Sequence, residues 1–162
     1  MFLLKVEELK VGENIQYTGE FVIMRDAAQK KLTQFQACPI NLEGKIIFYA
    51  GPAKKPDDCP IGAIGPTTSA RMDKYLEMLF KLGVKATVGK GGRSDLVRDL
   101  CKDYKSIYCI TPSGCAAGLS KKVIEHKILM FEELQSEAIQ KILVKDFPLI
   151  VAINSQGHTI WD

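Results

Sequence analysis

Apolar residues in the middle of the chain alternate between runs typical of buried strands and spacings typical of helices. Residues 45–50 are almost continuously apolar and rich in β-forming side chains, which favours a buried strand. In residues 72–80, apolar positions three and four apart form one helical face. Gly83 follows this pattern closely, so we expect it to end the helix.

The next stretch repeats the alternation of strand and helix. The pattern predicts strands at residues 84–88 and 106–111. Ser94 is expected to cap a helix between them. The residues of that helix expected to face the core are Leu96, Val97, Leu100, Cys101 and Tyr104.

The N-terminal part is richer in strand patterns. Residues 14–18 alternate, Gly19 interrupts the pattern, and residues 20–24 resume it, which predicts two short strands joined by a tight turn. Asp26 is expected to cap the helix that follows. The core-facing residues expected in that helix are Ala28, Leu32 and Phe35.

The C-terminal part has a similar strand-rich character. The pattern predicts a strand or a pair of strands at 123–131, a helix at 132–140, a strand at 148–153 and a final edge strand at 158–161. Together with the alternating middle, this favours an α/β fold, layered around a mixed sheet. A chain of 162 residues with no repeat or internal linker is expected to form a single domain over residues 1–162.

Composition excludes several classes of function. The net charge of +3, with no basic run interleaved with aromatic residues, does not indicate nucleic-acid binding. No apolar run approaches the roughly 18 residues of a membrane span, and the N-terminus does not resemble a signal peptide. We therefore expect a cytoplasmic protein with no membrane partner.

The cysteines do not form a recognisable metal or disulfide pattern. Their number is odd and no two have C-x-x-C spacing, so disulfides are not expected. Two of them read as core positions of a helix and a strand. Spacing alone leaves open whether three of the five meet at an iron–sulfur site. The five are Cys38, Cys59, Cys101, Cys109 and Cys115. The two histidines, His126 and His158, have no metal-ligand spacing and are expected to be structural.

Candidate chemistry is concentrated in residues 65–73, between a loop rich in Gly and Pro and the predicted helix. Thr67, Thr68 and Ser69 are expected where that helix has unpaired N–H groups and the positive end of its dipole. Arg71 follows Thr67 by four residues, so both side chains can address one small anion. A plain N-cap with a solvated arginine is the alternative interpretation.

Two more cations follow predicted strands, Arg25 and Lys90. Ligands of α/β sheets usually bind beyond the carboxyl ends of strands, where two arginines and a lysine would attract a dianion. The glycine-rich stretch around Lys90 lacks the spacing of a phosphate-binding loop.

The sequence of residues 65–73, Gly-Pro-Thr-Thr-Ser-Ala-Arg-Met-Asp, resembles the signature of iron–sulfur hydro-lyases related to class I fumarase. This family occurs as one long chain or as separate alpha and beta subunits. The present chain is similar to the whole beta subunit from about Val11 to its C-terminus. Other blocks resemble the family in the same order: Arg25-Asp26-Ala27-Ala28, Tyr49-Ala50-Gly51-Pro52, Gly89-Lys90-Gly91 and Gly114-Cys115-Ala116-Ala117.

The resemblance implies a swivelling β/β/α domain and reversible hydration of a C4 dicarboxylate, most simply malate and fumarate. It implies a [4Fe–4S] cluster held by the alpha subunit, with no metal ligand in this chain. It assigns carboxylate binding to Arg25, Arg71 and Lys90. It places Thr67 and Thr68 near the carbon that loses its proton, with Thr67 as the candidate base.

The implied partners are an alpha subunit and a second copy of this chain, within a heterotetramer. One departure from the family pattern is Gln29, which stands where the family commonly has histidine. A tartrate dehydratase beta subunit shares the signature and is the alternative enzyme. A non-catalytic docking domain and a stand-alone anion-binding module also remain open.

Overall fold

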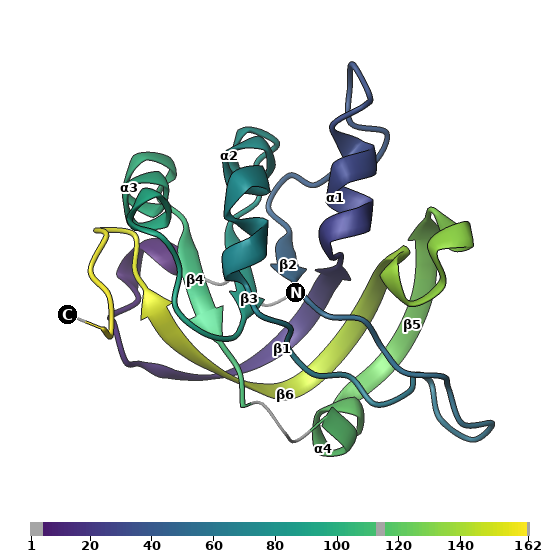
Figure 1. Cartoon of the computed structure of the whole chain (residues 1–162). Coiled ribbons are helices and arrows are strands. Elements are labelled where there is room, and N and C mark those ends of the chain that lie inside the picture. The colour runs from purple at the N-terminus through teal and green to yellow at the C-terminus, as the bar shows by residue number, and fades with distance from the viewer. Residues whose placement is uncertain (1–4, 113–115, 162) are drawn as a thin grey trace.

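The protein is built in three layers, two of strands and one of helices (Figure 1). The computed structural model describes residues 5–112 and 116–161. Its strands are β1 (Asn14–Ile23), β2 (Ile46–Phe48), β3 (Ala86–Gly89), β4 (Ile107–Ile110), β5 (Val123–Met130) and β6 (Ile139–Ile153). Its helices are α1 (Asp26–Leu32), α2 (Asp73–Lys81), α3 (Asp95–Tyr104) and α4 (Ala116–Ser120), with 3-10 turns η1 (Val6–Glu8), η2 (Ala70–Met72) and η3 (Glu132–Glu137).

The six-stranded sheet is mixed and partly closed on itself. Its order is β1-β2-β3-β4-β6-β5, and β1 also pairs with β6. Neighbours from β1 to β4 are parallel, whereas every pairing of β6 is antiparallel. β6 is 15 residues long, and it pairs with β1 over residues 140–150, with β5 over residues 139–144 and with β4 over residues 150–153. Five strands thus form a ring, and β5 continues outward from it.

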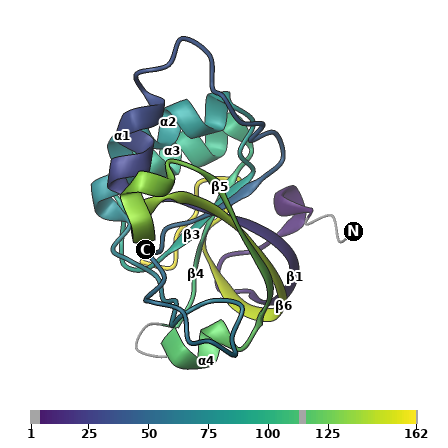
Figure 2. The same cartoon turned by 90° about the vertical axis from the view of Figure 1, so that its right-hand side faces the viewer.

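Two hydrophobic cores separate the three layers. Inside the ring, Phe21, Phe48 and Phe147 meet edge to face, with ring centroids 5.2–5.5 Å apart. The other core lies between the sheet and α1–α3, where Ile47 of β2 is buried with Leu76 and Leu79 of α2. Adjacent residues of β2 therefore serve opposite cores, as the two-residue period of a strand requires. Figure 2 shows α1–α3 together on one side, with the curved strands β1 and β6 beneath them. The predicted layered α/β fold with a mixed sheet is confirmed.

The strands and helices predicted in the middle of the chain are also confirmed. Gly83 follows α2 with φ +93°, the left-handed conformation in which glycine is favoured. Ser94 stands at the N-cap of α3, although its side chain makes no capping hydrogen bond. The prediction for Leu96 is wrong: it is 53% exposed, because the buried stripe of α3 runs through Val97, Leu100 and Cys101.

The predicted N-terminal hairpin is wrong. Residues 14–23 form one continuous strand that pairs with β6 on both sides of Gly19, with a register shift between Tyr17 and Gly19. A Cβ on Gly19 would lie 2.5 Å from the Tyr17 hydroxyl oxygen. The glycine therefore marks a bulge over which the Tyr17 ring folds, and not a turn.

The helix predicted from Asp26 is present but shorter than expected. Arg25 occupies the N-cap, Asp26 is the first helical residue and its carboxylate binds Arg71 instead of capping the helix. The prediction for Phe35 is wrong, because α1 ends at Leu32 and Phe35 is exposed beyond it.

Three of the C-terminal predictions are wrong in part. The helix predicted at 132–140 is only the 3-10 turn η3, and β6 begins at Ile139, nine residues before the predicted strand. Exposed Lys145 and Asp146 at a register irregularity interrupt the apolar pattern of this strand in the sequence. The predicted edge strand at 158–161 is reduced to an isolated bridge between Ile153 and Thr159. The predicted strand at 123–131 is confirmed as β5.

In the part of the chain that the structure describes, no helix combines the length and the apolar character needed to cross a membrane.

Candidate functional site

The carboxyl ends of the parallel strands bring the candidate site together. Arg25 follows the end of β1 by two residues, and Lys90 directly follows β3. Between them, the Thr67 N–H donates to the carbonyl oxygen of Tyr49 at the end of β2, at 2.8 Å. Thr68 forms an isolated bridge with Lys90. The five candidate residues therefore lie at one edge of the sheet, as predicted for α/β ligand sites.

The local geometry of the two threonines differs from the expectation. The turn η2 and then α2 begin only after Ser69. The Thr67 and Ser69 N–H groups are paired with the carbonyl oxygens of Tyr49 and Lys90, at 2.8 and 3.1 Å. The prediction of free helix N–H groups at these two positions is wrong, because the strand ends satisfy them.

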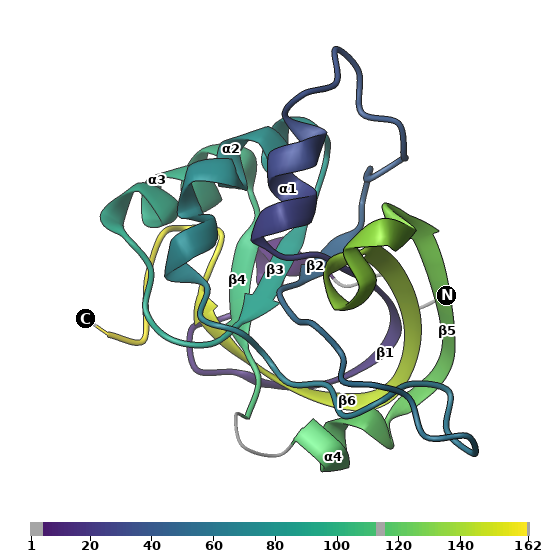
Figure 3. The same ribbon diagram turned by 45° about the vertical axis from the view of Figure 1, so that its right-hand side comes forward.

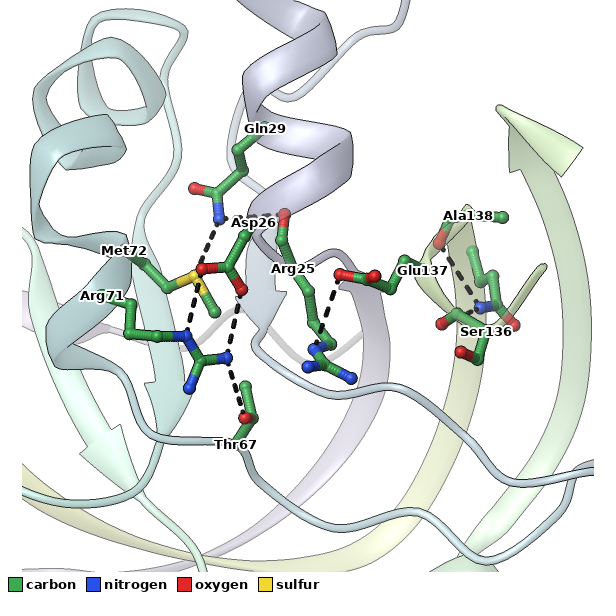
Figure 4. Close-up of polar contacts among 10 residues, drawn as sticks. Arg25, Asp26, Gln29, Thr67, Arg71, Met72, Ser136, Glu137 and Ala138 are labelled. Carbon is green, nitrogen blue, oxygen red and sulfur yellow. Dashed lines mark hydrogen bonds and ion pairs between the residues drawn. The ribbon is translucent and has the colours of Figure 1, made fainter. Parts of the chain in front are cut away.

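Arg71 and Thr67 are in direct contact, as their spacing predicted. Arg71 Nη2 donates to Thr67 Oγ1 at 3.2 Å (Figure 4). Arg71 Nε and Nη2 also donate to the two carboxylate oxygens of Asp26, each at 3.1 Å. The hydrogen bond from Arg71 holds the pKa of the Asp26 carboxyl below its usual value. Asp26 therefore stays ionised and fixes the plane of the Arg71 guanidinium.

Arg25 lies beside a second carboxylate. Its Nε is 3.8 Å from Glu137 Oε1, an ion-pair distance that is too long for a hydrogen bond. The same nitrogen is buried and has no hydrogen-bond partner among the described residues. A Cβ on Gly51 would lie 2.9 Å from Arg25 Nη1, so glycine leaves the room that this guanidinium occupies. The neighbours of Arg25 fix the position of its guanidinium but leave the hydrogen-bonding capacity of its Nε unused.

Lys90 and Thr68 complete the group without direct side-chain contacts. Within the described residues, neither side chain has a hydrogen bond or an ion pair. The site thus holds three cations against the carboxylates of Asp26 and Glu137. One positive charge is left over, which favours an anionic ligand.

Gln29 lies behind this group and not on its open side. Its side chain is fully buried, and its Nε2 is 3.4 Å from Met72 Sδ and 3.3 Å from the Arg25 carbonyl oxygen. Its Oε1 is buried with no partner among the described residues. Gln29 therefore links α1 to the segment that carries Arg71.

A buried cation that no sequence pattern indicated, Arg93, lies beneath the site. Its side chain has 0% exposure and its Nε lies 2.7 Å from Asp73 Oδ1. The guanidinium also donates to Thr87 Oγ1 at 3.1 Å and lies over the rings of Tyr49 and Tyr108, 5.2 and 4.9 Å from their centroids. Arg93 and Asp73 are 20 residues apart in the sequence, so no local spacing indicates their contact.

Tyr108 extends this buried network to the threonine segment. Its hydroxyl oxygen is 2.9 Å from Ser69 Oγ and 2.8 Å from the Gly91 carbonyl oxygen. Burial raises the pKa of Tyr108 to about 12, so the hydroxyl keeps its proton. A Cβ on Gly89 would lie 1.9 Å from Ser69 Oγ, which explains the glycine at this contact. Arg93 and Tyr108 together fix the segment of Thr67 against the loop of Lys90.

Cys101 and Cys109 are buried core residues, as their positions in the sequence predicted. Burial raises the pKa of both Cys101 and Cys109 to about 12, whereas cluster ligation requires thiolates. In residues 5–112 and 116–161, no three His, Cys, Asp or Glu side chains gather in a way that suits a metal ion. Cys115, with the block around Gly114, lies outside the described residues.

A cavity of about 910 Å³ lies at the other end of the sheet, by the amino ends of β2 and β3. Its lining includes Tyr17, Glu20, Lys45 and Lys85 and none of the five candidate residues. The candidate site is therefore separate from this cavity.

Similarity to known proteins extends over nearly the whole chain. Residues 2–162 match the protein family described as Fumarase C-terminus. The chain is 36% identical over 161 residues to the L(+)-tartrate dehydratase subunit beta of Escherichia coli K12, covering 96% of this chain and 80% of that protein. It is 35% identical over 162 residues to the anaerobic class I fumarate hydratase of the same organism, covering 96% and 30%.

A similar match is found with fumarate hydratase 2 of Leishmania major, at 34% identity over 163 residues, covering 97% of this chain and 29% of the relative. The chain thus spans most of a separate beta subunit and less than a third of the long fumarases. The relatives therefore include both separate beta subunits and long single chains, as the resemblance of residues 65–73 implied. The chain belongs to the Fumarase C-terminus family of class I fumarate hydratases and tartrate dehydratase beta subunits.

Proposed function

We propose that this chain is the beta subunit of an iron–sulfur-dependent hydro-lyase that interconverts a 2-hydroxy dicarboxylate and its dehydrated product, most simply malate and fumarate. The observation that carries the proposal is the contact between Arg71 and Thr67 at the carboxyl edge of the sheet. A carboxylate-binding cation and a hydroxyl are held there in one position. Such a pair suits the binding of a dicarboxylate next to the carbon that loses its proton.

Arg25, Arg71 and Lys90 are proposed to bind the substrate carboxylates. In Arg71, Nε and Nη2 bind Asp26, while Nη1 has no partner among the described residues and is the nitrogen that faces a ligand. Arg25 Nε also has unused hydrogen-bonding capacity. Lys90 supplies a point charge without a fixed geometry.

Thr67 is proposed as the base and Thr68 as its neighbour at the substrate. A hydroxyl is a weak base unless a nearby group stabilises its negative charge. The hydrogen bond that Arg71 donates to Thr67 Oγ1 provides this stabilisation. The buried contacts of Ser69 and Asp73 hold the Thr67 segment in place.

The proposed complex contains an alpha subunit that holds a [4Fe–4S] cluster, and two copies of each chain. The cluster, when bound there, supplies a Lewis acid for the leaving hydroxyl group. This chain supplies the carboxylate-binding and proton-transferring side of the pocket. Its open, cation-bearing edge matches the requirements of a half-site that another subunit covers.

Tartrate dehydratase is the second candidate. The chain is 36% identical over 161 residues to a tartrate dehydratase beta subunit and covers 80% of it. The substrate of either enzyme carries two carboxylates, and the same three cations serve both. Substrate assays therefore have to decide between them.

The test is anaerobic co-expression with the alpha subunit, followed by hydratase assays on malate, fumarate and L-tartrate. We expect turnover of malate and fumarate that is lost in Arg71→Ala and kept in Lys81→Ala, a change of an exposed cation at the end of α2. Turnover of tartrate alone would favour the second candidate. Full activity of Arg71→Ala would exclude the proposed site.

A further inference from the structure

The outer edge of the sheet is formed by β5, which has a strand partner on one side only. It pairs with β6 and stands at the end of the strand order (Figure 3). Within the described chain, no other backbone hydrogen bond or bridge reaches residues 123–130. Two large apolar side chains of this strand are exposed, Ile124 at 50% and Ile128 at 42%. An open edge with exposed isoleucines is a surface that proteins normally cover or protect.

Around His126, the sequence of β5 is complementary to itself when two copies run in opposite directions. Reading outward in both directions, the first neighbours are Glu125 and Lys127, and the second neighbours are Ile124 and Ile128. All four of these flanking residues are exposed. This complementarity can stabilise a contact only if the strand meets a copy of itself that runs in the opposite direction.

We propose that β5 pairs antiparallel with β5 of a second copy of this chain, about a two-fold axis at His126. In that register Glu125 of each chain lies opposite Lys127 of the other, and Ile124 lies opposite Ile128. Both contacts occur twice, as an isologous interface requires. Opposite charges and apolar pairs directly across an antiparallel ladder are stabilising.

Other arrangements of the same two edges are less favourable. A parallel, in-register pairing places Glu125 against Glu125 and Lys127 against Lys127, and like charges directly opposite are destabilising. A one-residue slip of the antiparallel register removes both ion pairs at once. The charge pattern therefore selects one orientation and one register.

The geometry of β5 suits this pairing. Its register with β6 shifts between Val123 and Glu125 and again between Ile128 and Met130. The regular ladder from Glu125 to Ile128 contains both residues of the proposed ion pairs, while Ile124 lies at the first shift. The His126 ring is held within its own chain, with Nε2 2.6 Å from Gln140 Oε1. The segment around the proposed axis is thus already ordered for pairing.

The inference rests on the homodimerisation in the proposed assembly and not on the proposed reaction. None of the five candidate site residues lies on β5.

The test is sedimentation velocity of the full chain and its charge variants. We expect wild type to sediment as a dimer, at twice the 18.0 kDa chain mass. Glu125→Lys and Lys127→Glu should each weaken dimerisation at least tenfold, because each places like charges opposite one another. The double swap Glu125→Lys/Lys127→Glu should restore it, and so should an equimolar mixture of the two single variants.

Lys10→Glu and Glu13→Lys make the same charge changes on an exposed N-terminal segment away from β5 and serve as controls. Circular dichroism confirms that each variant is folded. A dimer unaffected by the single changes, or not restored by the swap, would overturn pairing through β5 while leaving homodimerisation intact. A wild-type monomer would overturn both, whereas the hydratase assay of the complex tests the reaction separately.

Discussion

Arg71 holds the carboxylate of Asp26 with two nitrogens, Nε and Nη2, each 3.1 Å from one oxygen. Both side chains are substantially exposed, at 44% and 37%. Exposed ion pairs usually contribute only about 0–1 kcal/mol to stability. The main consequence of this pair is therefore geometric: it orients the guanidinium so that it also reaches Thr67.

Replacing Arg71 with lysine should damage catalysis nearly as much as replacing it with alanine. An ammonium group cannot hold Asp26 with two parallel hydrogen bonds and reach Thr67 as well. Loss of a charge-assisted bond of about 1.5–3 kcal/mol corresponds to roughly 10- to 150-fold in kcat/KM of the complex. A lysine variant within twofold of wild type would show that the planar fork is not needed.

The Thr67 hydroxyl, and not its methyl group, should be required. Thr67→Ser should keep measurable activity because the oxygen that accepts from Arg71 remains. Thr67→Val should lose it although valine keeps the shape and the β-branching, and the Thr67 N–H still binds Tyr49. The measurement is kcat of the reconstituted complex, with thermal unfolding as the control for folding. Equal activity of the valine variant would remove Thr67 from the mechanism.

The ion pair of Asp26 should make a pH-dependent contribution to stability. The pKa of Asp26 is lower in the folded protein than its usual 3.8, so the unfolded chain binds the proton more readily. The contribution is present above pH 3.8 and is lost as the pH falls through the folded-state pKa. Asp26→Asn should therefore lower the free energy of unfolding by at most about 1 kcal/mol at neutral pH.

This difference between wild type and Asp26→Asn should shrink as the pH is lowered through 3.8. Urea unfolding at a series of pH values measures it. A difference that grows in acid would contradict a lowered carboxyl pKa. Glu7→Gln, a change at an exposed carboxylate in η1, is the matched control.

The sequence predicted those parts of the fold that depend on local pattern. The strands and helices from β2 to β4 follow one another with clear periodicity, and Gly83 marks the end of α2. The ring was not predicted, because it depends on β1 and β6 pairing across most of the chain. A glycine such as Gly19 looks the same in sequence whether it forms a turn or a bulge.

The candidate site, too, was predictable only where its residues are close together in the sequence. Thr67 and Arg71 are four residues apart, so their contact was predictable. Asp26 is 45 residues from Arg71, and Glu137 comes from the turn η3, so neither was recognised as part of the site. Side chains that meet only through tertiary structure leave no local spacing to detect.

The Arg93–Asp73 pair should be far more important for stability than the exposed pair at Asp26. Both side chains are largely buried, with exposures of 0% and 12%. Breaking a buried pair by removing one partner typically costs about 3–5 kcal/mol, because the other charge stays buried. Arg93→Met should therefore lower the free energy of unfolding by about this amount, measured by urea denaturation.

A double-mutant cycle isolates the interaction between the two residues. Arg93→Met/Asp73→Asn should be less destabilised than the sum of the two single variants, because no unpaired charge remains. Additive effects would show that Arg93 acts through its contacts with Tyr49 and Tyr108 instead. Lys74→Met, an exposed cation on α2, is the control for charge removal.

The last prediction concerns the chain without its partner: it should be colourless and inactive, and activity should appear only with an alpha subunit that carries the cluster. Cys101 and Cys109 are buried thiols whose pKa is raised to about 12, so they are poor sources of the thiolates that iron requires. The site offers cations and the Thr67 hydroxyl, which bind and orient a dicarboxylate but do not by themselves activate its hydroxyl group to leave. Anaerobic reconstitution with iron and sulfide, read by thiolate-to-iron charge-transfer absorbance, tests this. The mixture with the alpha subunit under the same conditions is the positive control. A stable stoichiometric cluster on this chain, or hydratase turnover by the chain alone, would refute the two-subunit mechanism.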